Sequence, residues 1–185
     1  TRSIDFRASQ LKRLGDVLRS HETALYEAIR LDFGKSPYET CMTELSLIHG
    51  EINLAIRNLP RWSRKRRVPT NLANFPARSF IIPEPLGNAL VIGAWNFPYQ
   101  LSLIPAVSAI AAGCTVIVKP SELSPNASRA MARMINDAMD PAVIRVIEGG
   151  IHEATQLLHE RFDKVFFTGS TKVGRIVYQA AARQL

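Results

Sequence analysis

Three short polar clusters follow apolar runs of this chain, and their side chains are suited to bind a polar ligand. The first cluster is Trp95-Asn96, which comes after the apolar run of residues 89–92. The asparagine side chain is neutral and donates two N–H groups, and burying it is costly unless those groups find partners. Binding and catalytic residues often sit on loops that a rigid strand positions. Asn96 is therefore either a satisfied structural amide or a donor available to a ligand.

The second cluster, Lys119-Pro120-Ser121-Glu122, follows the apolar run of residues 115–118. A carboxylate just beyond a strand suits the paired hydroxyls of a ribose. The Lys119 ammonium could reach a ribose hydroxyl or a phosphate, and Pro120 stiffens the turn between the two charges. The alternative is a surface ion pair, which is worth at most about 1 kcal/mol.

The third cluster runs from Thr168 to Gly174 and contains Gly169, Ser170 and Thr171. The free N–H groups of a helix N-terminus attract anions, and Ser170 and Thr171 could cap such a helix or donate to a phosphate. Thr171 occupies the middle glycine position of the G-x-G-x-x-G fingerprint, so the backbone cannot approach a pyrophosphate as that motif allows. The alternative is an N-capped helix with a packing glycine at Gly174.

Strands and helices alternate through the second half of the chain. Apolar runs predict strands at residues 89–92, 115–118, 144–147 and 164–167, and helical patterns follow at 101–112, 126–138, 153–159 and 173–182. Continuous apolar strands separated by helices predict a doubly wound parallel sheet of the α/β, Rossmann-like class. Ligands bind such sheets at the carboxyl ends of the strands. The three clusters fall at those ends and together indicate a nucleotide site, with an amide donor at its reacting end.

The first third of the chain is predicted to be helical. Gly34 suggests a helix end, Ser36-Pro37 suggests the start of another helix, and Pro60 suggests its stop. Residues 77–82 predict a short strand in a hairpin arm that reaches towards another subunit. We therefore divide the chain into N-terminal helices with a basic connector at 1–76, an oligomerisation-type arm at 77–85, and an α/β domain at 86–185.

Composition narrows the class of protein. The chain has 185 residues, of which 46% are hydrophobic, enough for a sizeable core, and no apolar run is long enough for an integral membrane segment. Cys41 and Cys114 are isolated, which suggests a reducing, cytoplasmic setting, and the histidines lack metal-ligand spacing. The net charge of +7 is concentrated in residues 61–67, which is either a nucleic-acid patch or a solvated loop. Aromatic residues do not interleave with this run beyond Trp62, so we expect no nucleic-acid partner.

The order and spacing of the motifs resemble the aldehyde dehydrogenase superfamily over the whole second half of the chain. In the first third, Asp32-Phe33-Gly34-Lys35-Ser36 is similar to the class 3 and coniferyl-aldehyde branches. The motifs that carry the resemblance are Gly93-Ala94-Trp95-Asn96-Phe97-Pro98, Val118-Lys119-Pro120-Ser121-Glu122 and Phe166-Phe167-Thr168-Gly169-Ser170-Thr171 with Val173-Gly174.

The resemblance implies a role for each of these residues. Asn96 matches the asparagine whose amide helps to hold the oxyanion of a thiohemiacetal. Lys119 and Glu122, with Ser121 between them, match residues at the adenosine ribose of NAD or NADP. The turn made by Thr168, Gly169, Ser170, Thr171 and Gly174 matches the one facing the adenine ribose and pyrophosphate, and Trp95 lies near the nicotinamide.

The resemblance also implies what residues 1–185 lack. The nucleophilic cysteine and the general-base glutamate of the family lie beyond the helix that contains Gly174, and neither Cys41 nor Cys114 matches the nucleophile. We therefore expect the cofactor-binding part of an enzyme that oxidises aldehydes to carboxylic acids, without its catalytic domain and inactive alone. A homodimer is expected for the parent enzyme. A non-catalytic nucleotide-binding module and a binder of anionic surfaces remain the alternatives, and the choice between NAD and NADP is open.

Overall fold

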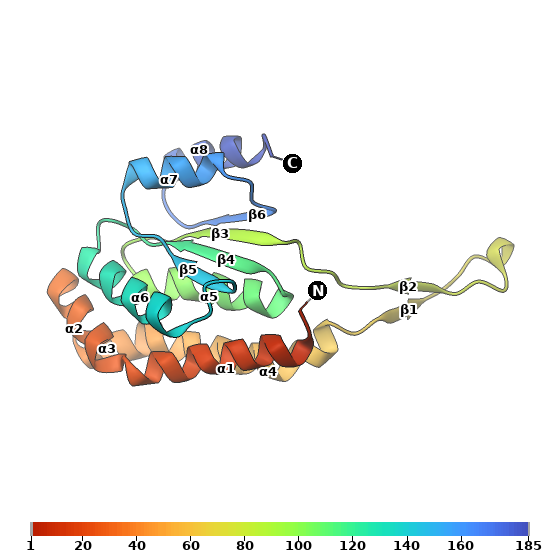
Figure 1. Ribbon diagram of the computed structural model, residues 1–185, viewed down its shortest axis with the longest axis horizontal. Helices are drawn as coiled ribbons and strands as arrows, with labels where there is room; N and C mark the ends of the chain where they lie inside the picture. The colour runs from red at the N-terminus through yellow and green to blue at the C-terminus, as the bar shows by residue number, and fades with distance from the viewer. Residues whose placement is uncertain (1, 185) are drawn as a thin grey trace.

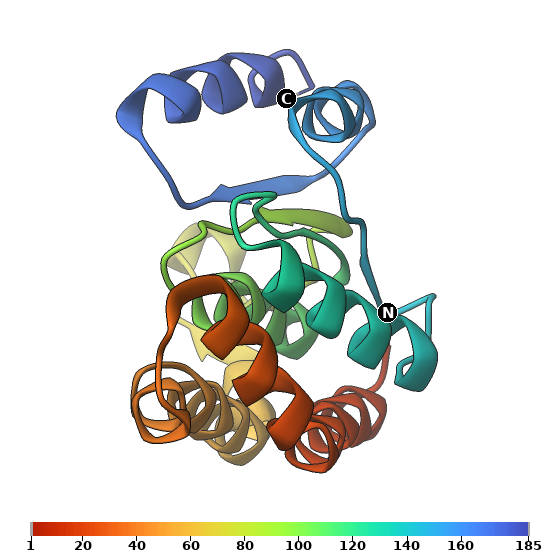
Figure 2. The same cartoon turned by 90° about the vertical axis from the view of Figure 1, so that its left-hand side faces the viewer.

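The computed structural model describes residues 2–184, which form four stacked layers with a projecting hairpin (Figures 1 and 2). Figure 2 shows α7 and α8 on one face of a sheet, α5 and α6 on the other, and α1, α2 and α4 beyond them. The elements are α1 (Ile4–Ser20), α2 (Glu22–Phe33), α3 (Pro37–Thr40), the π-helix η1 (Cys41–Leu45), α4 (Ser46–Trp62), β1 (Arg66–Val68), the 3-10 helix η2 (Leu72–Asn74), β2 (Ser79–Ile81), β3 (Asn88–Ile92), α5 (Pro98–Ala112), β4 (Thr115–Lys119), α6 (Pro125–Ala138), β5 (Ile144–Val146), α7 (Ile151–His159), β6 (Lys164–Phe167) and α8 (Thr171–Ala181).

The main sheet has the order β5-β4-β3-β6, and all of its strands are parallel. From β3 the chain moves outward through β4 to β5 and then returns to place β6 on the other side of β3. Helices cover both faces, so the predicted doubly wound α/β fold is confirmed. The order reverses between β3 and β6, and the carboxyl edge at that reversal is where such folds bind ligands.

The two faces of the sheet build two hydrophobic clusters because successive side chains of a strand point to opposite faces. Val91, Val116 and Val118 join the large cluster shared with α5, α6 and the N-terminal helices. Leu90 and Ile92 join a smaller cluster with Leu157 of α7 and Val177 of α8. Residues 89–92 of β3 and 116–118 of β4 are all apolar because both faces of the sheet are covered, which explains why the sequence pattern located these strands.

Helix α5 lies between the sheet and the N-terminal helices, and charged residues from those helices meet both of its ends. At the amino end, the Glu44 carboxylate accepts hydrogen bonds from the backbone N–H groups of Tyr99 and Gln100. At the carboxyl end, the Arg7 guanidinium donates to the carbonyls of Ala111 and Ala112. These signs complement the helix dipole, with negative charge at the N-terminus and positive charge at the C-terminus.

The predicted helix boundaries in the first third hold at two places and fail at a third. Gly34 ends α2 in the left-handed conformation with φ 69°, and Ser36 caps α3 with Pro37 at its first position. The prediction that Pro60 stops the next helix is wrong, because α4 continues to Trp62. Pro60 lies in the last turn, where its missing N–H removes a single hydrogen bond, and the Ser63 N–H still closes the helix on Leu59.

The hairpin arm begins earlier than its predicted bounds of 77–85. Strand β2 pairs antiparallel with β1, and Arg67 lies opposite Phe80. The first strand of the arm therefore comes from the basic run that we assigned to the connector. In a three-residue strand with two arginines the charge pattern hides the strand pattern, and such charges are typical of exposed strand edges.

The junction between β3 and α5 depends on the absence of a side chain at Gly93. A Cβ at this position would lie 2.1 Å from the Ser102 hydroxyl and 3.2 Å from the Ser102 Cβ. We expect Gly93→Ala to lower the free energy of unfolding by about 1–3 kcal/mol because of overpacking. Gly50→Ala in α4, where a Cβ meets no atom within 4 Å, should instead raise it by about 0.5–1 kcal/mol. Urea unfolding of both variants checks this, and a stable Gly93→Ala protein would contradict the packing described.

Candidate active site at the carboxyl ends of the parallel strands

The structure brings the three predicted clusters to one edge of the sheet. They follow β4, β3 and β6, which are neighbours. Two backbone hydrogen bonds tie these strand ends together, from the Gly93 N–H to the Lys119 carbonyl at 3.1 Å and from the Thr168 N–H to the Ile92 carbonyl at 3.0 Å. Trp95 and Asn96 are thereby placed between the Lys119–Glu122 turn and the Thr168–Gly174 turn.

The loop between β3 and α5 exposes the Asn96 side chain and fixes its backbone. Lys35 donates from Nζ to the Asn96 carbonyl oxygen at 2.8 Å. The neighbours of Asn96 are also held, because the Trp95 ring packs on Phe33 at 6.0 Å between centroids and Lys35 Nζ lies 4.2 Å from the centre of the Phe97 ring. The amide is therefore presented to solvent by a backbone that three contacts restrain.

Glu44 is an important residue that the sequence analysis missed. Its carboxylate is fully buried, and Oε2 accepts from the Tyr99 N–H at 2.8 Å and the Gln100 N–H at 3.3 Å. Oε1 faces Lys35 Nζ at 3.6 Å, an ion pair longer than a hydrogen bond. The sequence could have indicated that Glu44 is buried, because it stands four residues before Ile48 and one helical turn earlier on the face that α4 buries.

Burial raises the pKa of the Glu44 carboxyl above its ordinary value, and the hydrogen bonds from Tyr99 and Gln100 and the charge of Lys35 oppose that shift. Burial likewise raises the pKa of the Tyr99 phenol, reinforced by the nearby Glu44 charge. The Tyr99 hydroxyl remains a donor and bonds the Leu25 carbonyl at 3.0 Å. The region beneath the Asn96 loop is therefore shielded from water, and its buried carboxylate is only partly compensated, because two N–H groups bond Oε2 whereas Oε1 has no hydrogen-bond partner.

Lys119 is buried and is not freely accessible to a ligand. It is only 2% exposed, and its Nζ donates to the carbonyls of Pro120 at 2.6 Å and Gly149 at 2.5 Å. The same ammonium pairs with Glu122 at 3.3 Å, and the Glu122 side chain is 46% exposed. Ser121 accepts from the Leu123 N–H within the same turn. Glu122 is the charged group of this turn that faces solvent.

The turn between β6 and α8 shows the structural features of a capped helix. The Ser170 hydroxyl accepts from the Val173 N–H at 3.4 Å, and Thr171 is the first residue of α8. A Cβ at Gly169 would lie 2.5 Å from the Phe167 ring, and one at Gly174 would lie 3.4 Å from it. The two glycines therefore allow close packing on Phe167, and Gly169 does not adopt a positive φ. Ser170 and Thr171 are exposed, so the amino end of α8 is open to solvent.

Neither cysteine belongs to the three strand-end clusters. Cys114 is buried just before β4, at the amino end of that strand, which agrees with a packing role. Cys41 lies in the π-helix near Tyr26, and the pKa of Tyr26 is raised to about 12, first by burial and then by the neighbouring Cys41. Among residues 2–184, no three His, Cys, Asp or Glu side chains gather closely enough to hold a metal ion. In the same part of the chain, no helix has the length and apolar character that crossing a bilayer requires.

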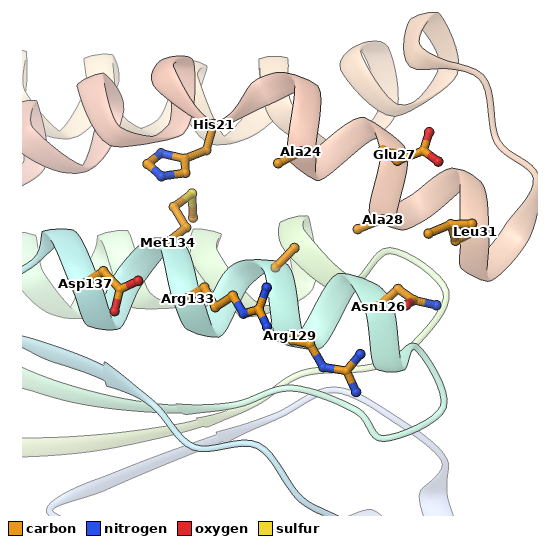
Figure 3. A pocket seen from close by; sticks show the side chains of 11 residues that line it. His21, Ala24, Glu27, Ala28, Leu31, Asn126, Arg129, Arg133, Met134 and Asp137 are labelled. Atoms are coloured by element: carbon orange, nitrogen blue, oxygen red, sulfur yellow. The ribbon is translucent and has the colours of Figure 1, made fainter.

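A groove of about 570 Å³ lies elsewhere, between α2 and α6 (Figure 3). It is lined by Ala28, Leu31 and Met134 together with the exposed Arg129 and Arg133. None of the residues of the three strand ends contributes to its wall. The groove is therefore separate from the candidate site.

Comparison with known proteins identifies the family. The model of the aldehyde dehydrogenase family matches residues 1–185. The chain is 46% identical to 4,4'-diaponeurosporen-aldehyde dehydrogenase of Staphylococcus aureus, covering 100% of this chain and 40% of that protein. It is 44% identical to human aldehyde dehydrogenase family 3 member B1, with the same coverage. The structure of S. aureus AldH in a substrate-bound state superposes with a TM-score of 0.96 at 45% identity, covering 99% of this chain and 40% of that one.

The chain belongs to the aldehyde dehydrogenase family. Its relatives are members of class 3, as the motifs in both halves of the sequence predict. It spans about 40% of the length of these relatives, and it corresponds to their amino-terminal part.

The titration of Glu44 should be visible in the stability of the protein. Its folded-state pKa is raised above the ordinary 4.5, so the folded state binds more protons than the unfolded state between those two values. Stability from this group is fully present below the ordinary value and falls as pH rises through the raised one. Urea unfolding at several values from about pH 4 to 8 gives the unfolding free energy of the wild type and of Glu44→Gln. We expect the difference, wild type minus variant, to fall as pH rises through this window. A difference that stays constant, or that moves in the opposite direction, would contradict it, and exposed Glu84→Gln is the control.

Proposed function

We propose that the protein is an NAD(P)-dependent aldehyde dehydrogenase that oxidises aldehydes to carboxylic acids, and that these residues form its cofactor-binding part. The observation that supports this most strongly is the placement of the Asn96 amide, which lies between two turns suited to a nucleotide. Family membership supports the reaction class. The activity, substrate and partners of the complete protein are part of this proposal.

Asn96 is proposed to stabilise the oxyanion that forms when a cysteine thiolate attacks the aldehyde carbonyl. A neutral donor that is already oriented is suited to this task, because it needs no reorganisation as charge develops on the oxygen. The restrained backbone and exposed side chain of Asn96 meet that requirement. The nucleophile and the general base are proposed to come from outside these residues, because neither Cys41 nor Cys114 belongs to the three strand-end clusters. The isolated chain is therefore proposed to be inactive.

The cofactor is proposed to lie across the carboxyl ends of β4, β3 and β6. Glu122 would accept hydrogen bonds from ribose hydroxyls, with Lys119 and Ser121 shaping its turn, and Trp95 would lie near the nicotinamide. The exposed amino end of α8, with Ser170, would receive the pyrophosphate, while Thr168, Gly169, Thr171 and Gly174 shape that turn. The bound nicotinamide would supply the hydride acceptor, and these residues would orient it.

A homodimer is proposed for the complete protein, built in part by the hairpin arm. The arm projects from the body (Figure 1) and exposes Leu72 and Phe75 near its tip. Large apolar side chains on a projecting segment are typical of surfaces that another chain covers. The basic residues of β1 lie on this arm, which supports a structural role for that charge run over nucleic-acid binding.

Asn96→Ala should lower kcat/KM for an aldehyde by about 10²- to 10³-fold in the complete protein. The loss follows from removing a donor to the developing oxyanion, and it should appear mainly in kcat. Steady-state kinetics measure it, and Asn53→Ala, an exposed residue on α4, serves as the matched control. An Asn96→Ala enzyme with unchanged kcat would refute the proposed role.

Glu122→Gln should shift cofactor preference towards NADP. The carboxylate repels a 2′-phosphate and accepts from a 2′-hydroxyl, so neutralising it removes a penalty against NADP. We expect the ratio of kcat/KM for NADP to that for NAD to rise about tenfold, which corresponds to about 1.4 kcal/mol. Glu160→Gln, at the exposed end of α7, should leave the ratio unchanged. If Glu122→Gln also leaves it unchanged, Glu122 does not contact this part of the cofactor.

A further inference from the structure

We propose that Lys35 and Glu44 form a positioning pair that fixes the Asn96 loop and sets the rate of the reaction through Asn96 without touching the substrate. This inference rests on the function proposed above for Asn96. Both residues come from the N-terminal helical segment and lie outside the three strand-end clusters, and Lys35 belongs to the run of residues 32–36 that resembles class 3.

Lys35 holds the loop from one side. Its ammonium donates to the Asn96 carbonyl at 2.8 Å across 61 residues of sequence. The same Nζ lies 4.2 Å from the centre of the Phe97 ring and 5.6 Å from that of Phe33. Phe33 in turn packs against Trp95. One cation therefore connects the backbone of Asn96 with the aromatic neighbours on both of its sides.

Glu44 holds the segment that follows. The N-cap residue of α5 is Phe97, whose side chain cannot accept a hydrogen bond from the first turn. The Glu44 carboxylate takes that role from a distance by bonding the N–H groups of Tyr99 and Gln100. Its second oxygen lies 3.6 Å from Lys35 Nζ, so the two residues restrain the loop as one unit.

The Lys35–Glu44 pair is better suited to positioning the Asn96 loop than to stabilising the fold alone. A serine or aspartate at residue 97 could cap α5 locally, without burying a carboxylate from another element. Burying an ion pair is costly, and replacing such pairs with apolar residues is often neutral or stabilising. The interhelical pair additionally sets where the loop lies relative to the N-terminal helices. A catalytic donor needs that precision, because displacement by about 1 Å can greatly slow a reaction.

The first test is kinetic and uses the complete protein. We expect Lys35→Met to lower kcat by about tenfold with little change in the KM for the aldehyde, because a displaced donor still permits substrate binding. Lys35→Arg, which keeps the charge and the donors, should restore part of the rate. Adding Lys35→Met to Asn96→Ala should cost no further activity, since both changes act through one amide.

The second test is independent of activity. In the complete protein, the emission of Trp95 is isolated as the difference between each protein and the same protein carrying Trp95→Phe. Lys35→Met should shift the maximum of this Trp95 emission. Arg30→Met is the matched control, because Arg30 is an exposed residue of α2 that pairs with Glu27, and it should leave the emission unchanged.

The outcomes separate this inference from the function on which it rests. If Asn96→Ala lowers kcat but Lys35→Met changes neither kcat nor Trp95 emission, the positioning pair is overturned and the role of Asn96 stands. Fully additive losses in the double variant would also overturn it. If Asn96→Ala itself has no effect on kcat, the proposed function fails first, and the pair has no catalytic donor to position.

Discussion

The buried carboxylate of Glu44 is the interaction on which the arrangement of this site depends. It meets the amino end of α5, while Arg7 meets the carboxyl end, so that helix is held at both ends by charges of the N-terminal segment. Asp32 binds the amino end of α6 in a similar way, because its carboxylate accepts hydrogen bonds from the N–H groups of Asn126 and Ala127. The helices that follow β3 and β4 therefore start where the N-terminal segment places them. That segment is part of the frame of the site.

The polar residues of the site fall into two groups. Some are buried and bonded within the protein, so they support the site, and others are exposed and can contact a ligand. Lys119 and Glu44 are buried, and other parts of the protein bond the Lys119 ammonium and one oxygen of the Glu44 carboxylate, while the second oxygen faces Lys35. Glu122 and the Asn96 side chain remain exposed, as does Ser170 at the amino end of α8. In a nucleotide site the buried charges would hold the turns in place, and the exposed polar groups would make the contacts. The family motif groups Lys119 with Glu122, but the structure gives them different surroundings.

The parts of the fold that could be predicted are those determined by local burial. Strands β3 to β6 were located from their apolar runs, and Gly34 and Ser36 marked helix boundaries because each acts on its own neighbours. β1 was missed because two arginines in a three-residue strand look like a charge run. Glu44 was missed because its partners lie 55 and 56 residues away. The sequence placed Asn96 at the end of a strand, but the residues that hold it became visible only when the N-terminal helices were seen against the sheet.

The carboxyl ends of β4, β3 and β6 are proposed to form one nucleotide site with Asn96 at its reacting end. A crystal structure of the complete protein with NAD bound is the decisive measurement. We expect ribose hydroxyls within about 3 Å of the Glu122 carboxylate, the pyrophosphate at the amino end of α8, and the nicotinamide beside the Asn96 loop. A dinucleotide bound in the groove between α2 and α6, or one that makes no contact with Glu122 and α8, would contradict it.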